Sequence, residues 1–364
     1  MSQPARRGFY RPELDLLRFV AFLLVFFDHA LGGFGLPLVS KFGEACRSGL
    51  PVFFLLSSYL ITELLLREHR KTGTIHIKAF FLRRVLRIWP LYLLFLTAVY
   101  LAWRLGHGYF PGPAFLAFLF ISGNWYVYAF GFLQFAVGPL WSISVEEQFY
   151  LVWPFLVLVG AQRALKAFIP VVLLASVVAI WYSGHYDLPL NKYWTNSLIQ
   201  FQFFAFGAII ALVLHDREFT LSARGRGLFF GAGCAAFLSL VFLFPLAANL
   251  SINALHLLIA YGLMGVISVC LFLGFYGMRL PAMCSPLVYL GRISYGMYVF
   301  HLSILQVIGS FLHRHGKWAT IPIQMAGMMA ALGLTILVAM ASYRFLESPF
   351  LRLKDRFTFV HSRS

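Results

Sequence analysis

The sequence predicts an all-α fold, a polytopic transmembrane bundle with about ten spans, one short re-entrant segment and both termini in the cytoplasm. Three observations lead to this prediction. Hydrophobic residues make up 60% of the chain and charged residues only 12%, whereas a soluble domain has about 25% charged residues. Apolar runs long enough to cross a bilayer recur along the chain. Basic residues gather in alternate loops, as expected for loops that stay in the cytoplasm.

Ten apolar runs have the length of a membrane span. They cover residues 14–34, 48–66, 86–104, 138–160, 168–183, 198–215, 227–246, 254–276, 287–312 and 320–342. A further run, Ala114–Ser122, is shorter, and it lies between Pro113 and Gly123. Membranes tolerate incomplete spans where protein covers them. We therefore expect this run to form a re-entrant or interfacial segment.

The distribution of charge orients the bundle. The segment 67–87 holds seven Lys and Arg residues and is expected in the cytoplasm. With the short run not counted as a span, the later basic loops and the C-terminal tail fall on the same side. The net charge of +16 is then explained by basic residues in cytoplasmic loops, and we expect no nucleic-acid partner.

The rest of the composition predicts a simple domain organisation. We see no internal repeat, and residues 1–364 are expected to form a single membrane-embedded domain without an appended soluble domain. The four cysteines form no CxxC pair, so neither a metal site nor a disulfide is expected. A multi-pass protein of the plasma or inner membrane follows from these features.

The first span carries Arg18 near one end and Asp28 and His29 near the other. A helix turns about 100° and rises about 1.5 Å per residue, so Arg18 and His29 share one face about 16 Å apart. Ionisable groups within a membrane usually face a protein interior or a wet cavity. Arg18 has an equally good alternative, which is contact with lipid headgroups. For His29 a functional role is favoured, and Asp28 points about 100° away from it.

The polar residues of the second and third spans each have a structural explanation. They indicate a ligand passage only when the two groups are considered together. Ser57 and Ser58 lie mid-span, where serine most often supports helix packing; the alternative is a narrow surface for a ligand. Arg83, Arg84 and Arg87 are expected on one side of the third span. Three guanidinium groups suit a phosphate-bearing ligand, although positive-inside orientation alone also explains them.

The stretch WSISVEEQFYLVWP places two carboxylates at the start of the fourth span. Adjacent helical residues point in different directions, so one of Glu146 and Glu147 is expected to face the bundle. A carboxylate beside His29 would hold the imidazole in the tautomer that a general base needs. The alternative is a pair of first-turn acids favoured by the helix dipole, with Ser142 or Ser144 as the N-cap.

The stretch SYGMYVFH adds Tyr298 and His301 at mid-membrane to outer depth. Functional and structural roles are equally expected for His301. The sequence shows no clear donor for a developing oxyanion, and Tyr298 and Ser57 are the two residues we consider for it. Ser144 is a further supporting position.

Several ordered motifs resemble the acyltransferase-3 family of integral-membrane acyltransferases. They are Arg18-x10-His29, FFLLSSYLI, RRVLRIWPLY, WSISVEEQFYLVWP, SYGMYVFH and ESPF. The resemblance implies transfer of an acyl group, commonly acetyl from acetyl-CoA, to hydroxyls of acceptors such as surface polysaccharides, peptidoglycan sugars and macrolides. It further implies that His29 is the catalytic histidine and that Arg18 is its basic partner. Glu147 would be the acidic residue of its motif.

For the donor, the resemblance implies that Arg84 and Arg87 hold the CoA phosphates. We add Arg83 and Ser57 to this acyl-CoA site, and we add Glu146 as the second candidate acid. The family usually has glycine where this chain has Ser58, which bears on helix spacing and on the length of the acyl group. Direct transfer and relay through an acyl-histidine both remain open, as does a homodimeric assembly.

The sequence therefore predicts a membrane O-acyltransferase in which His29 is the base for transfer from cytoplasmic acyl-CoA to an extracytoplasmic glycan or similar acceptor. The alternative is a transporter or exporter of a lipid-linked sugar or metabolite. Transporters often contain internal repeats with broken helices in both halves. Here the buried polar residues concentrate in the first four spans, which favours one active site. A non-catalytic sensor is the third option.

Overall fold

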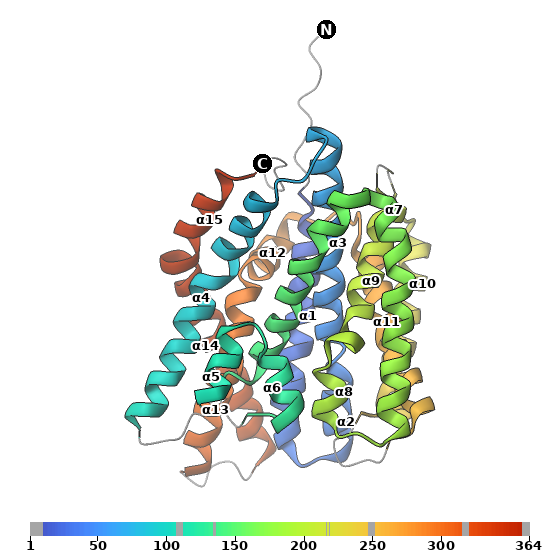
Figure 1. Cartoon of the computed structure of the whole chain (residues 1–364). Helices are drawn as coiled ribbons and strands as arrows, with labels where there is room; N and C mark the ends of the chain where they lie inside the picture. The colour runs from blue at the N-terminus through green and yellow to red at the C-terminus, as the bar shows by residue number, and fades with distance from the viewer. Residues whose placement is uncertain are drawn as a thin grey trace.

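The computed structural model describes residues 10–106, 112–133, 136–215, 217, 219–246, 252–314 and 320–358, and every regular element in these ranges is a helix (Figure 1). The long helices are α1 (Pro12–Leu31), α3 (Gly49–Thr72), α4 (Ile77–Leu105), α7 (Trp141–His185), α9 (Ser197–Leu214), α10 (Ala223–Phe242), α11 (Ala254–Phe275), α13 (Ser294–Arg314) and α14 (Ile321–Ser342). The starts of α9, α10 and α11 are capped by the side chains of Asn196, Ser222 and Asn253, which accept backbone N–H groups.

Eight helical stretches of the described chain are long and apolar enough to cross a membrane, by length and composition. The first helix is outside this group, since it carries Glu13, Asp15, Arg18 and Asp28. Helix α7 counts once, although its 45 residues would extend about 68 Å if straight, twice the thickness of a bilayer core. The chain is therefore a multi-pass membrane protein, and the exact number of spans stays a prediction.

Helix α7 joins two of the predicted spans without a loop. At Ala161 the backbone leaves the helical region, with φ 43° and ψ −123°, and Figure 1 shows α7 bending there at one end of the bundle. The residues expected to form a basic loop, Arg163 and Lys166, are helical. The backbone thus stays helical on both sides of Ala161, where the chain reverses direction.

Two other predicted elements are divided. The run 287–312 forms α12 (Ser285–Arg292) and α13, with a break at Ile293. The short run becomes α5 (Gly112–Leu119), followed by α6 (Gly123–Phe130). Each of these has eight residues and measures about 12 Å, so neither can cross a membrane alone. The short helices α2 (Pro37–Cys46), α8 (Leu190–Trp194) and α15 (Ser348–Asp355) complete the described bundle, with a π-helical turn at Tyr343–Glu347 before α15.

Helix α1 lies at the centre of the bundle, between two hydrophobic clusters. On one side Leu14, Leu17 and Ala21 pack with apolar residues of α3, α9 and α11. On the other side Phe22 and Phe26 pack with apolar residues of α13 and α14. Its start lies at the same end of the bundle as α15 (Figure 1). The polar face of α1 is thereby turned toward neighbouring helices.

Close helix contacts predict where the fold tolerates no added atoms. A Cβ at Gly207 of α9 would lie 2.2 Å from the backbone oxygen of Leu55 in α3. We expect Gly207→Ala to lower the free energy of unfolding by roughly 1–3 kcal/mol, because overpacking outweighs the gain in helix propensity. Thermal unfolding of the purified protein in detergent measures this effect.

The matched control is Gly262→Ala in α11, where an added Cβ meets nothing within 4 Å. This variant gains the same helix propensity without a clash and is expected to unfold at or slightly above the wild-type temperature. If the two variants unfold at the same temperature, α9 and α3 are not in close contact at Gly207.

Candidate active site

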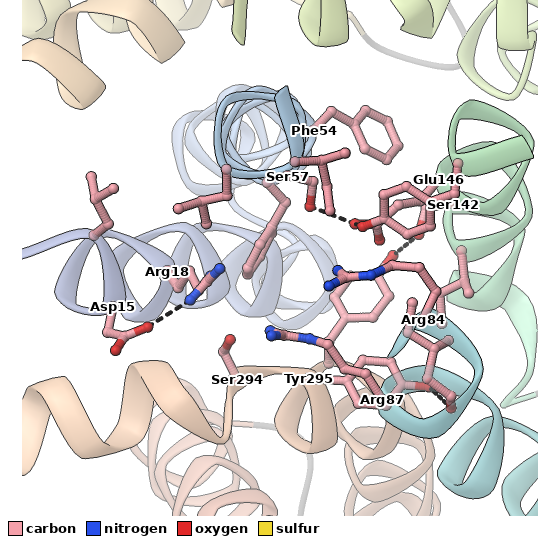
Figure 2. Close-up of a pocket in the computed structure, with 18 of the residues that line it drawn as sticks. Asp15, Arg18, Phe54, Ser57, Arg84, Arg87, Ser142, Glu146, Ser294 and Tyr295 are labelled. Carbon is pink, nitrogen blue, oxygen red and sulfur yellow. Dashed lines mark hydrogen bonds and ion pairs between the residues drawn. The ribbon is translucent and has the colours of Figure 1, made fainter. Parts of the chain in front are cut away.

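A cavity of about 170 Å³ opens between α1, α3, α4, α7 and α13, and we call it the inner cavity (Figure 2). Arg18, Arg84 and Arg87 extend their guanidinium groups into the same space, together with Glu146 (Figure 2). Five basic and two acidic side chains contribute to its lining, namely Arg11, Arg18, Arg84, Arg87 and Lys354 against Asp15 and Glu146. The lining thus carries three more positive than negative charges, so the cavity favours an anionic ligand.

Arg18 is held by a carboxylate one turn earlier in α1. Its Nη1 atom lies 2.6 Å from Oδ1 of Asp15, a buried residue. The Tyr10 hydroxyl donates to Oδ2 of Asp15 at 3.2 Å, and burial raises the pKa of Tyr10, which keeps this donor protonated. Asp15 was missed by sequence reasoning, although its spacing of three residues from Arg18 was a usable signal.

Arg84 has a buried N–H group, on Nε, that forms no hydrogen bond with the described residues. Its guanidinium lies over the Tyr150 ring, 5.6 Å from the centroid, and over the Phe80 ring at 5.8 Å. Its Nε atom is buried and has no hydrogen-bond partner among the described residues. A buried donor without a partner costs about 1–3 kcal/mol, and an anionic ligand in the cavity would supply the acceptor.

Arg83 points elsewhere, which corrects the expectation that three arginines share one face. Its Nη2 atom donates to Oε2 of Glu68 at 2.8 Å, and its Nη1 atom donates to the Phe357 carbonyl at 2.7 Å. Glu68 is buried in α3, so it requires a positive partner. Arg83 therefore ties α4 to α3 and to the C-terminal segment, and it does not line the inner cavity.

The two glutamates of α7 occupy different surroundings. The hydroxyls of Ser57 and Tyr150 both donate to Glu146, which lines the inner cavity. Glu147 is buried beside Trp89, whose Nε1 atom donates to Oε2 at 3.4 Å, and it does not line this cavity. The i, i+4 spacing of Glu146 and Tyr150 was a signal for the partner that sequence reasoning missed.

The start of α7 differs from the expected capped terminus. A 3₁₀ turn, Gly138–Leu140, precedes it, and the N-cap residue is Leu140. Ser142 lies inside the helix and donates to the Pro139 carbonyl at 3.0 Å. Ser144 is buried and lines neither cavity. The prediction that either serine caps this helix was wrong, because the 3₁₀ turn already supplies the first backbone contacts.

A second cavity of about 290 Å³ contains His29, and we call it the outer cavity. Asp28 and Arg47 line it and form an ion pair, with Nε 3.1 Å from Oδ1. Its remaining walls are largely apolar and aromatic, with Phe132, Trp141 and Trp194 among them. Arg47 was missed by sequence reasoning, because its pairing with Asp28 depends on the approach of two helices.

Two residues belong to the lining of both cavities, Leu50 of α3 and Tyr298 of α13. The Tyr298 hydroxyl donates to the Pro139 carbonyl at 2.9 Å and lies 2.5 Å from Oγ of Ser142. The inner cavity, with its arginines, and the outer cavity, with His29, therefore adjoin at a thin wall. Arg18 and His29 both lie on α1, but Arg18 lines the inner cavity and His29 lines the outer cavity.

The imidazole of His29 faces another histidine. Its Nδ1 atom lies 2.8 Å from the Val25 carbonyl and 3.4 Å from Nε2 of His301. His301 in turn places Nδ1 2.6 Å from the Tyr298 carbonyl. Neither Glu146 nor Glu147 is a hydrogen-bond partner of His29 among the described residues, so the expected glutamate beside this ring is replaced by His301.

The sequence matches known proteins along most of its length. Residues 11–341 match the acyltransferase-3 family, which is described as an acyltransferase domain. The chain is 27% identical to the peptidoglycan O-acetyltransferase OatA of Listeria monocytogenes, over 93% of this chain and 56% of that protein. It is 26% identical to the O-acetyltransferase OatA of Staphylococcus aureus strain NCTC 8325, over 93% of this chain and 57% of that protein.

The chain thus spans a little over half the length of these relatives. No solved structure matches it significantly.

If the C-terminal segment lies in the cytoplasm, as the sequence predicts, the inner cavity opens on the cytoplasmic side and the outer cavity on the opposite side. Phe132 lines the outer cavity and Lys354 lines the inner one. In a background with the four native cysteines replaced by serine, Phe132→Cys is expected to react with a membrane-impermeant maleimide in intact cells. Lys354→Cys is expected to react only after permeabilisation. The reversed pattern would show that the inner cavity opens outside the cell.

Proposed function

The chain belongs to the acyltransferase-3 family, and from that premise we propose that it is a membrane O-acyltransferase. It transfers an acyl group, acetyl in the simplest case, from acyl-CoA on the cytoplasmic side to a hydroxyl of an extracytoplasmic glycan. One observation carries the proposal: a basic cavity and a histidine-containing cavity adjoin within the same bundle, at Leu50 and Tyr298. This arrangement suits a donor and an acceptor that approach from opposite sides.

The inner cavity suits the donor. Acyl-CoA carries several phosphate groups, and guanidinium groups bind phosphate oxygens in a forked geometry. Arg84 offers a buried Nε atom with no hydrogen-bond partner among the described residues, and Arg87 lies one turn further along α4. The distance along α1 from Arg18 to His29 is about 16 Å, which an extended pantetheine arm matches in length.

His29 is the proposed base. A backbone carbonyl accepts hydrogen bonds and cannot donate them, so the contact with Val25 requires a proton on Nδ1 of His29. In the neutral ring the lone pair then lies on Nε2. This nitrogen makes no hydrogen bond with any residue that the structure describes, and the side chain is exposed to the outer cavity.

The reaction then balances as a single acyl transfer. Nε2 of His29 takes the proton of the acceptor hydroxyl while the hydroxyl oxygen attacks the thioester carbonyl carbon. The carbon–sulfur bond breaks, and the CoA thiolate leaves. The imidazolium of His29 returns its proton to the thiolate, so an ester and free CoA are the products.

The outer cavity suits a sugar acceptor. Trp141 and Trp194 form part of its wall, with ring centroids 6.2 Å apart, and aromatic faces combine apolar area with polar edges. The similar proteins of Listeria and Staphylococcus are named O-acetyltransferases, and the first of them is named for peptidoglycan. We therefore propose a glycan of the cell envelope as the acceptor class, with the enzyme in the plasma membrane.

Replacing His29 tests the base. Purified His29→Ala is expected to transfer labelled acetyl from acetyl-CoA to an envelope glycan at least roughly 10²-fold more slowly, because general base catalysis is lost. The control is His185→Ala, since His185 stacks on Trp181 at the exposed end of α7 and lines neither cavity. Wild-type transfer by His29→Ala would exclude the proposed base.

Replacing the cavity arginines tests the donor site. Arg84→Gln and Arg87→Gln are each expected to weaken CoA binding by about 10–100-fold, the loss of one charged hydrogen bond. Binding of pantetheine, which lacks the nucleotide phosphates, is expected to stay unchanged. Titration calorimetry measures both, with the exposed Arg163→Gln as control. Equal losses for CoA and pantetheine would show that these arginines do not bind phosphate.

A further inference from the structure

His301 is a histidine buried beside the reactive ring, and the proposed transfer reaction does not yet use it. Its exposed fraction is 0%. Its ring centroid lies 5.0 Å from that of His29. The Phe22 ring of α1 forms a T-shaped pair with it, with centroids 6.1 Å apart and planes at 90°, and the centroid of the Tyr298 ring lies 5.5 Å away. A buried imidazole in such apolar surroundings is costly unless its polar atoms are hydrogen-bonded.

Both nitrogens of His301 have a partner, and the partners determine its tautomer. The Tyr298 carbonyl can only accept, so Nδ1 of His301, 2.6 Å away, carries the proton. Nε2 of the neutral ring is then an acceptor. The atom that faces it, at 3.4 Å, is Nδ1 of His29, which the Val25 contact has already identified as protonated.

The two rings therefore form a hydrogen-bonded chain, in which His29 donates to His301 and His301 donates to a backbone carbonyl. His29 shares its Nδ1–H between the Val25 carbonyl and His301, and His301 passes its own N–H to the Tyr298 carbonyl. The Val25 contact lies within α1, whereas the His301 contact comes from α13. Both contacts restrain rotation of the His29 ring, and the contact from α13 fixes it relative to a second helix.

We propose that His301 is a positioning residue, which accepts the Nδ1–H of His29 and thereby directs the Nε2 lone pair of His29 at the acceptor hydroxyl. The inference rests on the proposed function. The same hydrogen bond persists when His29 takes up the acceptor proton, because Nδ1 remains a donor in the imidazolium. A neutral acceptor thus stabilises the charged ring without a second charge beside it.

Three substitutions separate positioning from simple anchoring. His301→Leu removes both hydrogen bonds at similar volume. His301→Gln places an amide oxygen near the former Nε2 atom and so keeps the acceptor for His29. His301→Asn places its amide near the former Nδ1 atom and so keeps the bond to the Tyr298 carbonyl alone.

We expect His301→Leu and His301→Asn to lower kcat roughly 10–100-fold, the size typical when the partner that orients a reacting imidazole is lost. KM for acetyl-CoA is expected to stay within about twofold, because the donor cavity is untouched, and His301→Gln is expected to restore most of kcat. The control is His256→Leu in α11, a histidine that also contacts a carbonyl, with Nε2 3.0 Å from Pro245, but lines neither cavity.

The opposite pattern would overturn the inference. If His301→Asn is active and His301→Gln is not, His301 only anchors α13 to its own backbone. If all three variants keep wild-type kcat while His29→Ala is inactive, His29 is a base that needs no positioning by His301. If His29→Ala itself is active, the proposed function fails, whatever the His301 variants do.

Discussion

The cost of ionised side chains within a membrane governs the arrangement of this bundle. Such groups are stable only when they are paired or face a protein interior, and α1 carries several of them. Arg18 is paired with Asp15 of the same helix, and Asp28 is paired with Arg47 beyond α2. Glu13 accepts a backbone N–H from Gly277 after α11. The first helix can therefore not face lipid, and the two hydrophobic clusters around it follow from this requirement.

The same constraint explains why the cavities are built as they are. A polar cavity within a membrane exists only where helices shield it, and α1 supplies polar groups to both cavities while its apolar residues fill the clusters on either side. The inner cavity gains its positive charge from α1 and the residue before it, from α4 and from Lys354 of α15. Among the described residues that line the outer cavity, Asp28 and Arg47 form the one ion pair, so the ring of His29 meets a less charged environment than Arg18 does.

The sequence predicts the positions of residues along a single helix, but it does not predict contacts between residues of different helices. Helical spacing predicted that Arg18 and His29 share one face of α1, and in the structure they line two adjoining cavities rather than one. The partner of His29 lies 272 residues away in α13, and no periodicity connects the two. Arg83 turns from its neighbours because a buried carboxylate of another helix, Glu68, takes it. A reversal near Ala161 was expected, because one span was predicted to end at residue 160 and the next to begin at 168. The sequence did not indicate that the residues between these spans stay helical.

The wall between the cavities has a consequence for any transfer across it. A continuous polar channel would let ions cross the membrane, so an enzyme with substrates on opposite sides needs a barrier that yields only to the donor. Leu50 and Tyr298 form this wall, and Tyr298 is held by neutral hydrogen bonds to Pro139 and Ser142 rather than by ion pairs. Each such bond contributes only about 1 kcal/mol, whereas several charged contacts to phosphate contribute more. If acyl-CoA is the donor, as proposed, charged contacts to its phosphates would outweigh the loss of these two bonds when its narrow arm passes Tyr298. The backbone carbonyl of Tyr298 also accepts the Nδ1–H of His301.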